Sequence, residues 1–450
     1  MKPTIPQGTR DFNAETIRKR NYIFNTIKNV FELYGFQPLE TPAMENLETL
    51  TGKYGEEGDQ LLFKILNNGL EKKQEQAKFD FEKVLEGKNN AGITERALKY
   101  DLTIPFARYV AMNHGQLSFP FKRYQVQPVW RADRPQKGRY REFYQCDADI
   151  VGSNSLLNEI ELLNIYLAVF KKLNIDVQLK INNRKILSGL AELCGGTSKI
   201  TDISVPIDKL DKVSWEKVKD ELSQRGLMSQ QIDLIEQYIF IDGGNVSKLE
   251  KVRSLIGEIE IGRQGIRELE FLLTFLNNPS NIVIDFKLAR GLNYYTGTII
   301  EVKAQNVQMG SIGGGGRYDD LTCLFNVPNL PGVGISFGVD RIYDVMEELK
   351  LFPSALQTTT QILFFNLGEA ESKIAYNLMQ QLREQNIKSE IYHEQAKFDK
   401  QFKYAERKNI PYIIIIGSKE LEENNCTIKN IQTGRQEIVA QSQLLTYSFE

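Results

Sequence analysis

The spacing of apolar side chains predicts most elements in the first part of the chain. Apolar residues recur at helical spacing over 15–34, and Gly35 ends this helix. Two β segments at 121–129 and 140–150 flank a polar, glycine-containing loop, which predicts a long antiparallel hairpin with a charged tip. Residues 195–278 are charged and mostly helical, as in an inserted domain. The other predicted elements are a strand at 36–41, a solvated hairpin or helical excursion at 67–92, a helix at 155–173, strands at 282–288, 297–302 and 332–337, and a helix at 340–349.

The pattern changes after residues 351–360, where a proline and a run of threonines mark a linker. Strands then alternate with helices, which is typical of a separate α/β domain with a largely parallel sheet. The alternating segments are 362–365, 372–386, 389–392, 398–409 and 412–416. The predicted organisation is a first domain made of residues 1–194 and 279–350, a helical insertion at 195–278, the linker at 351–360 and a second domain at 361–450.

The composition excludes several classes of function. The chain has 56 Lys and Arg against 58 Asp and Glu, so any RNA contact must come from local basic patches rather than a global positive field. The longest apolar run, Tyr412–Ile416, is too short to cross a membrane, and the N-terminus lacks the apolar core of a signal peptide, so we expect a cytoplasmic protein. Four widely spaced cysteines predict neither a zinc knuckle nor a disulfide framework. With only two histidines, arginines and carboxylates must carry the chemistry.

The loop of the predicted hairpin concentrates positive charge in a nearly neutral chain. Guanidinium groups bind phosphate in a bidentate manner, which suits a nucleoside triphosphate or an RNA backbone. A solvated charged turn would have the same composition. The strand that follows favours a site, because an aromatic, an amide and two carboxylates alternate on one face and would line a polar pocket. The basic residues are Arg131, Arg134, Lys137, Arg139 and Arg141, and the alternating ones are Phe143, Gln145, Asp147 and Asp149.

Three later segments add weaker signals. In 288–297 a strand ends beside Arg290 and two glycines flank a tyrosine pair, although a β-turn with surface aromatics would look the same. The run Gly313–Gly316 permits close approach of the backbone to a ligand, but it could equally form a flexible hairpin. In 334–341 a strand leads into a helix with Arg341 in its first turn. A cation is unfavourable at that end of a helix, so a bound anion would explain it.

The order of these segments resembles the catalytic domain of class II aminoacyl-tRNA synthetases, and in particular the histidyl-tRNA synthetase family. Segment 288–297 is similar to the histidine-specific motif, and 139–147 resembles the second class motif in its eukaryote-like version. The opening 8–12, the amino-acid-binding loop 100–109 and the third class motif around Arg341 are also similar. The resemblance covers nearly the whole chain. It implies an α+β catalytic domain built on an antiparallel sheet, a helical insertion, and a C-terminal α/β domain that looks like the anticodon-binding module.

The resemblance implies where histidine binds. Asp101 and Thr103, with Leu102 between them, would hold the α-amino group of histidine. A polar pocket that hydrogen-bonds both ring nitrogens would reject isosteres that lack them. The other histidine-binding residues that the resemblance implies are Arg131, Gln145, Asp149, Arg290, Tyr294 and Tyr295.

The resemblance also implies how ATP binds. Arg131 and Arg290 would be the catalytic residues, on opposite sides of the α-phosphate. Arg139 and Arg341 would contact the outer phosphates, and Phe143 would stack on adenine. Because the carboxylate of histidine is already a nucleophile, its attack on phosphorus requires charge neutralisation and in-line placement but no general base. Mg²⁺ bound with ATP would add positive charge, and the sequence identifies no protein ligands for a tightly bound metal.

The implied function is that of a histidine–tRNA ligase, which forms histidyl-adenylate from ATP and L-histidine and transfers histidine to the 3′ end of tRNA(His). Arg134 and Gln136 would meet the acceptor end of the tRNA. The helix at 15–34 and the strand after it resemble the first class motif, which forms a two-fold interface, so a homodimer is expected. No membrane partner is expected.

Two other functions explain the sequence less well. A non-catalytic paralogue that senses histidine as a regulatory subunit usually lacks the anticodon-binding domain and the phosphate-binding arginines, which this chain has. An RNA-binding module without catalysis would not explain the pocket residues. Two positions depart from the family pattern: Lys99 replaces an arginine, and Asn293 replaces an aspartate, so that any salt bridge there becomes a plain hydrogen bond.

Overall fold

The computed structural model describes residues 2–52, 55–136, 138–277, 279–289, 295–356 and 360–449. The chain forms two compact units. They are a larger unit of Met1–Phe12 with Arg20–Leu351 and a smaller unit of Asn13–Lys19 with Phe352–Glu450. Among the described residues, no helix is long and apolar enough to cross a membrane.

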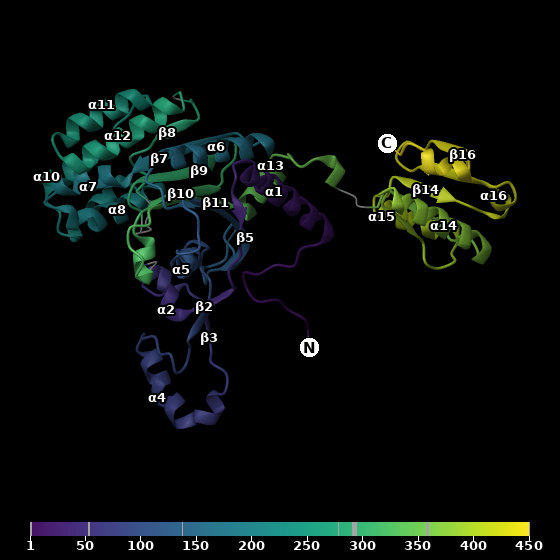
Figure 1. Ribbon diagram of the computed structural model, residues 1–450, viewed down its shortest axis with the longest axis horizontal. Helices are drawn as coiled ribbons and strands as arrows, with labels where there is room; N and C mark the ends of the chain where they lie inside the picture. Colours follow the sequence, from purple (N-terminus) through teal and green to yellow (C-terminus); the bar gives the residue numbers. More distant parts are fainter. Residues whose placement is uncertain are drawn as a thin grey trace. The chain divides into compact units, whose positions relative to one another are not determined.

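An eight-stranded sheet forms the centre of the larger unit (Figure 1). Its strands are β1 (Gln37–Pro38), β5 (Phe121–Trp130), β6 (Glu142–Val151), β7 (Val177–Asn183), β8 (Ile282–Ile284), β9 (Thr298–Ala304), β10 (Gly313–Tyr318) and β11 (Gly332–Gly338). The order across the sheet is β1-β5-β6-β11-β10-β9-β7-β8, and the pairs are antiparallel except β1 with β5 and β7 with β8. The predicted antiparallel sheet and its long β5–β6 hairpin are therefore confirmed.

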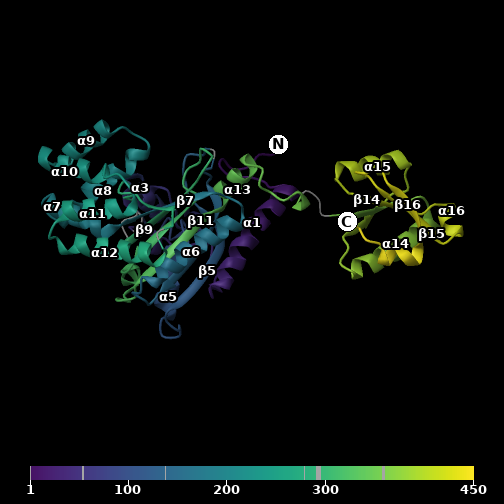
Figure 2. The ribbon, with the colours of Figure 1, turned by 90° about the horizontal axis from the view of Figure 1, so that it is seen from above.

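Helices cover one face of this sheet (Figure 2). They are α1 (Ala14–Leu33), α6 (Leu157–Lys172) and α13 (Val339–Glu348). Phe31 of α1 and Tyr166 of α6 both pack on the Phe337 ring of β11, with ring centroids 5.8 Å and 4.7 Å away. Arg20 of α1 pairs with Asp340 of α13 at 2.5 Å, and both side chains are buried. Apolar and ionic contacts thus fix the covered face, and the polar residues of alternate strand positions face the other way.

The glycines at the start of β10 lie in the middle of the sheet, so the flexible-hairpin alternative is wrong. Gly313–Gly316 pair with β9 on one side and β11 on the other, and all four are buried. A Cβ on Gly315 would overlap the backbone of Gly334. A Cβ on Gly313 would lie 2.8 Å from the ring of Tyr166. Glycine is required here because the neighbouring strand and the covering helix approach the backbone too closely for any side chain.

A group of helices packs beside β7 and β8 (Figure 1). They are α7 (Arg184–Leu193), α8 (Ile200–Asp208), α9 (Trp215–Gln224), α10 (Ser229–Ile239), α11 (Asn245–Ile256) and α12 (Glu260–Phe275). Gly189 and Gly262 let α7 and α12 approach closely, because a Cβ on Gly189 would lie 2.8 Å from the Cα of Gly262. The described part of 195–278 contains helices and no strand, as the sequence predicts.

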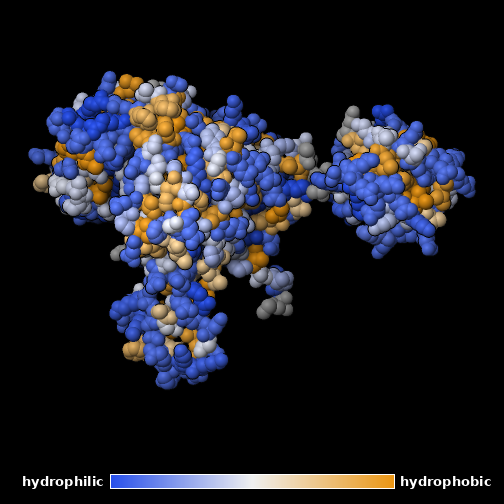
Figure 3. All heavy atoms as spheres, viewed as in Figure 1, coloured by the Kyte–Doolittle hydropathy of each residue, from blue (hydrophilic) through white to orange (hydrophobic). Residues whose placement is uncertain are grey.

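A second, smaller sheet carries a projecting segment. Its strands are β2 (Met44–Asn46), β3 (Lys64–Ile65) and β4 (Arg96–Leu98), and the segment contains α4 (Gln74–Leu85). Of the two alternatives for 67–92, the structure has the helical one, and Figure 3 shows mostly hydrophilic residues with scattered apolar ones over it. The other helices here are α2 (Leu47–Leu50), α3 (Gly55–Gln60) and α5 (Thr103–Asn113). Short 3-10 helices of the chain are Leu70–Lys73, Thr197–Lys199, Lys209–Asp211, Leu321–Phe325, Ser354–Leu356 and Gln441–Thr446.

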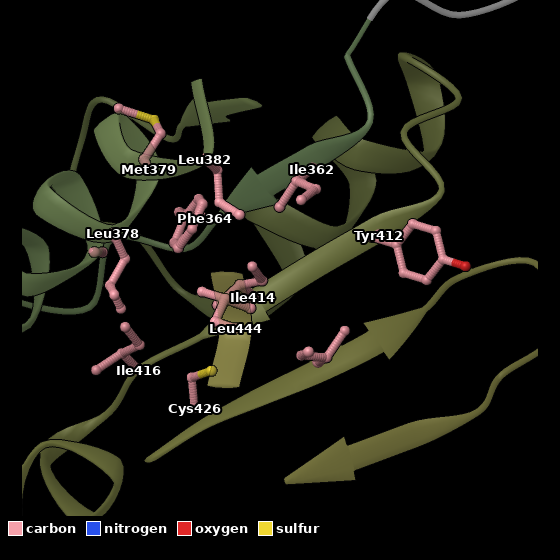
Figure 4. Packing of buried hydrophobic residues seen from close by; sticks show 12 residues of the cluster. Ile362, Phe364, Leu378, Met379, Leu382, Tyr412, Ile414, Ile416, Cys426 and Leu444 are labelled. Atoms are coloured by element: carbon pink, nitrogen blue, oxygen red, sulfur yellow. The ribbon is translucent and has the colours of Figure 1, made fainter. Parts of the chain in front are cut away.

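The smaller unit is an α/β domain with a five-stranded sheet. Its elements are β12 (Ile362–Phe364), α14 (Glu369–Glu384), β13 (Ser389–Ile391), α15 (Phe398–Arg407), β14 (Tyr412–Ile415), α16 (Ser418–Glu422), β15 (Asn425–Asn430) and β16 (Gln436–Ala440). The order is β13-β12-β14-β15-β16, in which the first three strands are parallel and the last two antiparallel. Phe364, Ile414 and Leu378 meet in its core (Figure 4). The parallel part follows the sequence analysis, whereas β15 and β16 lie where no element was predicted.

The glycine strand gives the first testable prediction. Gly315→Ala should lower the unfolding free energy of the larger unit by about 3 kcal/mol, because the new Cβ meets backbone atoms that cannot rotate away. Thermal or urea unfolding followed by circular dichroism would measure the change. Gly115→Ala is the matched control, because a Cβ on that exposed glycine meets nothing within 4 Å. Equal stability of the two variants would contradict the close approach of β10 and β11.

Candidate active site

The face of the eight-stranded sheet opposite α1 and α6 bears a cavity of about 970 Å³. Residues of β6, β9, β10 and β11 line it, together with the loop between β5 and β6. Asp208, Asp211 and Lys212 from the helical insertion also line it. This volume lies at the upper end of the range for small-molecule sites, so there is room for a nucleotide and an amino acid together.

Alternate residues of β6 face this cavity. Phe143, Gln145, Asp147 and Asp149 all line it, as the alternation in the sequence predicts. On β11, Ser336 lies directly opposite Asp147, and glycines lie opposite the neighbouring polar residues. The glycine beside Asp149 is required, because a Cβ there would overlap the carboxylate. The floor of the cavity therefore presents polar side chains of β6 next to bare backbone of β11.

A fully buried arginine lies beside the carboxylates. Nη2 of Arg123 on β5 is 2.8 Å from Oδ2 of Asp149, an ion pair rather than a linear hydrogen bond. The guanidinium also lies over the ring of Phe106, 4.1 Å from its centroid. The hydroxyl of Tyr318 donates to the other oxygen of Asp149. Burial raises the pKa of Asp149, and Arg123 and Tyr318 oppose this rise.

Asp147 is the carboxyl whose protonation the site alters most clearly. Burial raises its pKa to about 7, with a smaller contribution from the neighbouring charge of Asp149. Arg123 and a hydrogen bond from Ser336 act in the opposite direction. Oδ1 of Asp147 has no hydrogen-bond partner among the residues that the structure describes. Protonation of this carboxyl near neutral pH therefore changes the charge of the cavity floor.

Arg131 lies on the cavity wall between two aromatic rings. Its Nε donates to the backbone oxygen of Tyr100 at 3.0 Å. The guanidinium is 4.3 Å from the centroid of Tyr100 and 5.1 Å from that of Phe143. Its Nη2 is 3.5 Å from Oε1 of Gln145. These contacts restrict the side chain to one orientation, so its positive charge is held in place before a ligand binds.

Arg139 and Arg341 lie at another part of the same cavity. Nε of Arg341 donates to the backbone oxygen of Gly138 at 3.0 Å, and its Nη1 donates to that of Ser311 at 2.7 Å. Arg139 forms an ion pair with Asp133 at 2.9 Å. The structure thus brings together the two arginines expected to bind phosphate, and Arg341 holds the tip of the hairpin against the sheet.

Of the three residues of the amino-acid-binding loop that are predicted to bind histidine, two reach the cavity. Asp101 and Thr103 line it at the start of α5, and Oδ1 of Asp101 accepts from the backbone N–H of Ile104 at 3.1 Å. The side chain of Leu102 is buried in the core and does not line the cavity. Tyr295 lines the cavity and is 8% exposed.

The remaining predicted site residues fall into two groups. At the hairpin tip, Gln136 lines the cavity and bridges to Arg139, whereas Arg134 is exposed and does not line it. Arg290 and Tyr294, as well as Asn293, lie outside the described residues.

Lys99 is buried under the β5–β6 hairpin. Its Nζ donates to the backbone oxygen of Thr41 at 3.0 Å and to Oε1 of Gln127 at 2.8 Å. Burial lowers its pKa to about 8. The amine is therefore still mainly protonated at neutral pH, and it joins the start of the β2 region to β5.

The sequence analysis missed several groups of this site. Arg123 carried one available signal, because it starts a polar alternation with Gln125 and Gln127 along β5. Lys303 of β9 lines the cavity and pairs with Asp211 of the insertion at 2.7 Å, a contact between distant segments that no local pattern indicates. Within the described ranges there is no group of three or more His, Cys, Asp or Glu placed to hold a metal ion.

Comparisons with known proteins identify relatives of the whole chain. The family profile described as Histidyl-tRNA synthetase matches residues 71–342, and the profile described as Anticodon binding domain matches 361–448. The histidine–tRNA ligase of Phocaeicola vulgatus is 51% identical, covering 99% of this chain and 98% of its own. The crystal structure of histidyl-tRNA synthetase from Nostoc sp. PCC 7120 superimposes with a TM-score of 0.81 at 32% identity, over 99% and 98% of the two chains. The apo S. aureus histidyl-tRNA synthetase, at 21% identity and a TM-score of 0.70 over 100% of both chains, shows likeness of fold alone.

The raised pKa of Asp147 predicts how its contribution to stability depends on pH. Between about pH 4 and pH 7 the folded protein keeps a proton that the unfolded chain has released, so stability falls as pH rises through this range. Asp147→Asn removes this effect. The unfolding free energy of the variant, relative to that of the natural chain, should therefore rise by about 1.4 kcal/mol for each pH unit in this range. Urea unfolding at pH 5 and pH 8 would test this, and a difference independent of pH would contradict it.

Proposed function

The chain belongs to the histidyl-tRNA synthetase family, and from this premise we propose how its residues carry out the ATP-dependent ligation of histidine to tRNA. It is a class II aminoacyl-tRNA ligase, as relatives named histidine–tRNA ligase at about 50% identity over nearly full length establish. The observation that supports the residue roles best is the position of Arg131 beside the polar row of β6 in one cavity. A non-catalytic histidine sensor has less support, because the chain keeps both the cavity arginines and the anticodon-binding domain.

Histidine would bind over the floor formed by β6. The carboxylate of Asp101 and the hydroxyl of Thr103 would accept hydrogen bonds from the α-ammonium group. Gln145, Asp149 and Tyr295 would surround the rest of the ammonium group and the imidazole ring. Tyr294 would join them by family resemblance, while Leu102 would contribute through its backbone. Neutral and charged acceptors buried in one place favour a ligand with several N–H donors and disfavour analogues that lack them.

ATP would bind with its α-phosphate next to the histidine carboxylate. A carboxylate oxygen attacks the α-phosphorus, and the bond to the bridging oxygen breaks, so pyrophosphate leaves with the electron pair. Arg131 on one side and Arg290 on the other would neutralise the charge that develops there. Arg139 and Arg341 would bind the leaving phosphates, and Phe143 would stack on adenine.

Mg²⁺ accompanies ATP in our proposal and supplies further positive charge at the phosphates when bound. Magnesium is usually held by one or two carboxylates together with substrate phosphates and water. Glu301 fits this requirement, because it lines the cavity and Ser311 connects it to Arg341, the arginine proposed for the outer phosphates. The protein would thus add little to a metal site that ATP largely provides.

Transfer to tRNA would use both units of the chain. The terminal ribose hydroxyl attacks the carbonyl carbon of the adenylate, and AMP leaves. We propose that Arg134 and Gln136 meet the acceptor end and that residues 361–450 bind the anticodon region. Helix α15 and the residues next to its ends carry five basic side chains, of which Lys400 pairs with Glu394 and Lys408 with Glu390. The remaining basic residues there are Lys397, Lys403 and Arg407.

We further propose a cytoplasmic homodimer organised into the domains 1–194 with 279–350, 195–278 and 361–450, with 351–360 as linker. Helix α1 and the strand after it would form the two-fold interface, by resemblance to the first class motif. The cytoplasm is where ATP and tRNA meet. Light scattering at micromolar concentration tests the dimer.

Arg290→Ala tests the proposed catalytic step. Loss of one preorganised charge at the reacting phosphate should slow histidine-dependent pyrophosphate exchange about 100- to 1,000-fold without changing the melting temperature. Arg267→Ala provides the control, because this exposed arginine of α12 pairs with Glu260 on the surface. Near-normal exchange in the Arg290 variant would remove its assigned role.

Truncation after Leu356 tests the division of labour between the units. The cavity residues all precede position 342 and the smaller unit has a core of its own, so pyrophosphate exchange should stay within about threefold of the full chain. Transfer of histidine to tRNA should fall sharply, by about 100-fold or more, because the phosphate contacts of this unit are lost. A truncated protein that charges tRNA as well as the full chain would contradict the assignment of residues 361–450.

A further inference from the structure

The two ends of the Gln145 side-chain amide have the same shape but opposite hydrogen-bonding roles, since the nitrogen donates and the oxygen accepts. Nε2 lies 2.8 Å from Oγ of Ser336 on β11. Oε1 lies 3.5 Å from Nη2 of Arg131 on the cavity wall. The donor end therefore points to the neighbouring strand, and the acceptor end points to the side of the cavity where Arg131 lies.

Ser336 can hold this orientation because its hydroxyl has only one proton. In the β6–β11 register it lies directly opposite Asp147 and donates to that carboxylate. With its proton used there, the hydroxyl oxygen is left as an acceptor, and it accepts from Nε2 of Gln145. While Asp147 is ionised, its carboxylate can only accept, and it thus sets the direction of each hydrogen bond in the series.

The opposite orientation of the amide would be unfavourable at both ends. A flipped Gln145 would place its oxygen against the Ser336 oxygen, so two acceptors would face each other unless Ser336 gave up its bond to Asp147. Its nitrogen would at the same time face the guanidinium of Arg131, and two donors would meet. Loss of a hydrogen bond in a buried place costs more than its formation contributes, so the observed orientation is strongly preferred.

Strand β5, on the other side of β6, does not supply a side chain that orients the Gln145 amide. Gln125 of β5 lies opposite Asp147, but its Nε2 already donates to Thr41 and Gln127. Asp147 itself is 2% exposed. Of the two strands that pair with β6, β11 is therefore the one with a hydroxyl opposite Asp147, and its positions opposite Gln145 and Asp149 are glycines.

We propose that Ser336 and Asp147 are positioning residues, which fix the Gln145 amide so that its carbonyl oxygen accepts a hydrogen bond from the α-ammonium group of histidine. The inference rests on the proposed place of histidine beside Gln145. Neither residue has to touch the substrate. Their effect is on specificity, because a fixed acceptor favours ligands with an amine and leaves an unpaired group when the amine is missing.

The test compares two inhibitors of histidine-dependent pyrophosphate exchange that differ in the amine. Histidinol keeps the amine, and imidazolepropionate lacks it. In Ser336→Ala, the KM for histidine and the inhibition constant of histidinol should rise about tenfold, the equivalent of one hydrogen bond. The inhibition constant of imidazolepropionate and the KM for ATP should change less than about twofold. A general disturbance of the cavity would weaken both inhibitors alike and would overturn the proposal.

Four further variants separate the possible causes of a change in these inhibition constants. The quantity compared is the inhibition constant of histidinol divided by that of imidazolepropionate. Ser336→Thr keeps the hydroxyl, so this ratio should return to its value in the natural chain. Ser188→Ala removes a hydroxyl of α7 that donates to the backbone oxygen of Arg184 and does not line the cavity, so this ratio should not change. Asp147→Asn keeps the shape but can turn a donor towards Ser336, and it should raise the ratio even if the Ser336 variant does not fold. Gln145→Ala tests the premise that histidine binds beside Gln145, and an unchanged ratio in this variant would refute that placement. If the ratio changes in Gln145→Ala but not in Ser336→Ala, only the positioning role of Ser336 is refuted.

Discussion

The burial of opposite charges within a β-sheet is the constraint on which the site depends. Asp147 and Asp149 lie on the cavity floor with almost no exposure to solvent, where an unpaired carboxylate would be too costly to keep ionised. Arg123 supplies the compensating charge from the next strand and is itself fully buried over Phe106. Removing one member of such a group typically costs ~3–5 kcal/mol, because the other charge is left behind. Strand pairing and the charge of the cavity floor are therefore coupled, because the register that pairs β5 with β6 also places Arg123 opposite Asp149.

Close packing of backbone gives the cavity its space. The covered face of the sheet is filled by rings, such as Phe31 and Tyr166 against Phe337. On the cavity face β11, the strand next to β6, carries Gly334 where a side chain would overlap the carboxylate of Asp149. Gly315 of β10 serves a different purpose, because a Cβ there would overlap the backbone of Gly334 and keep β10 and β11 apart. Glycine is therefore required on these strands both for the open floor of the cavity and for close strand pairing.

The sequence predicted those features that a short period encodes. Period-two alternation placed Phe143, Gln145, Asp147 and Asp149 on one face, and helical spacing placed α1. The glycines of β10 carry no such signal, because glycine is equally common in turns. Lys303 and Asp211 meet only through the tertiary structure. For Arg290 and Tyr294 the support is the resemblance of their motif to the family.

The departure at Lys99 shows which property of that position the fold requires. A guanidinium would bring five donors into a place that is almost completely buried, whereas the amine of Lys99 brings three and uses two of them on Thr41 and Gln127. Gln127 in turn lies opposite Gln145 in the β5–β6 register, and it also accepts from Gln125. A single cation at 99 is therefore enough to orient the amides beneath the cavity. In this chain a buried positive charge with two hydrogen bonds is sufficient at position 99, and the planar fork of arginine is dispensable there.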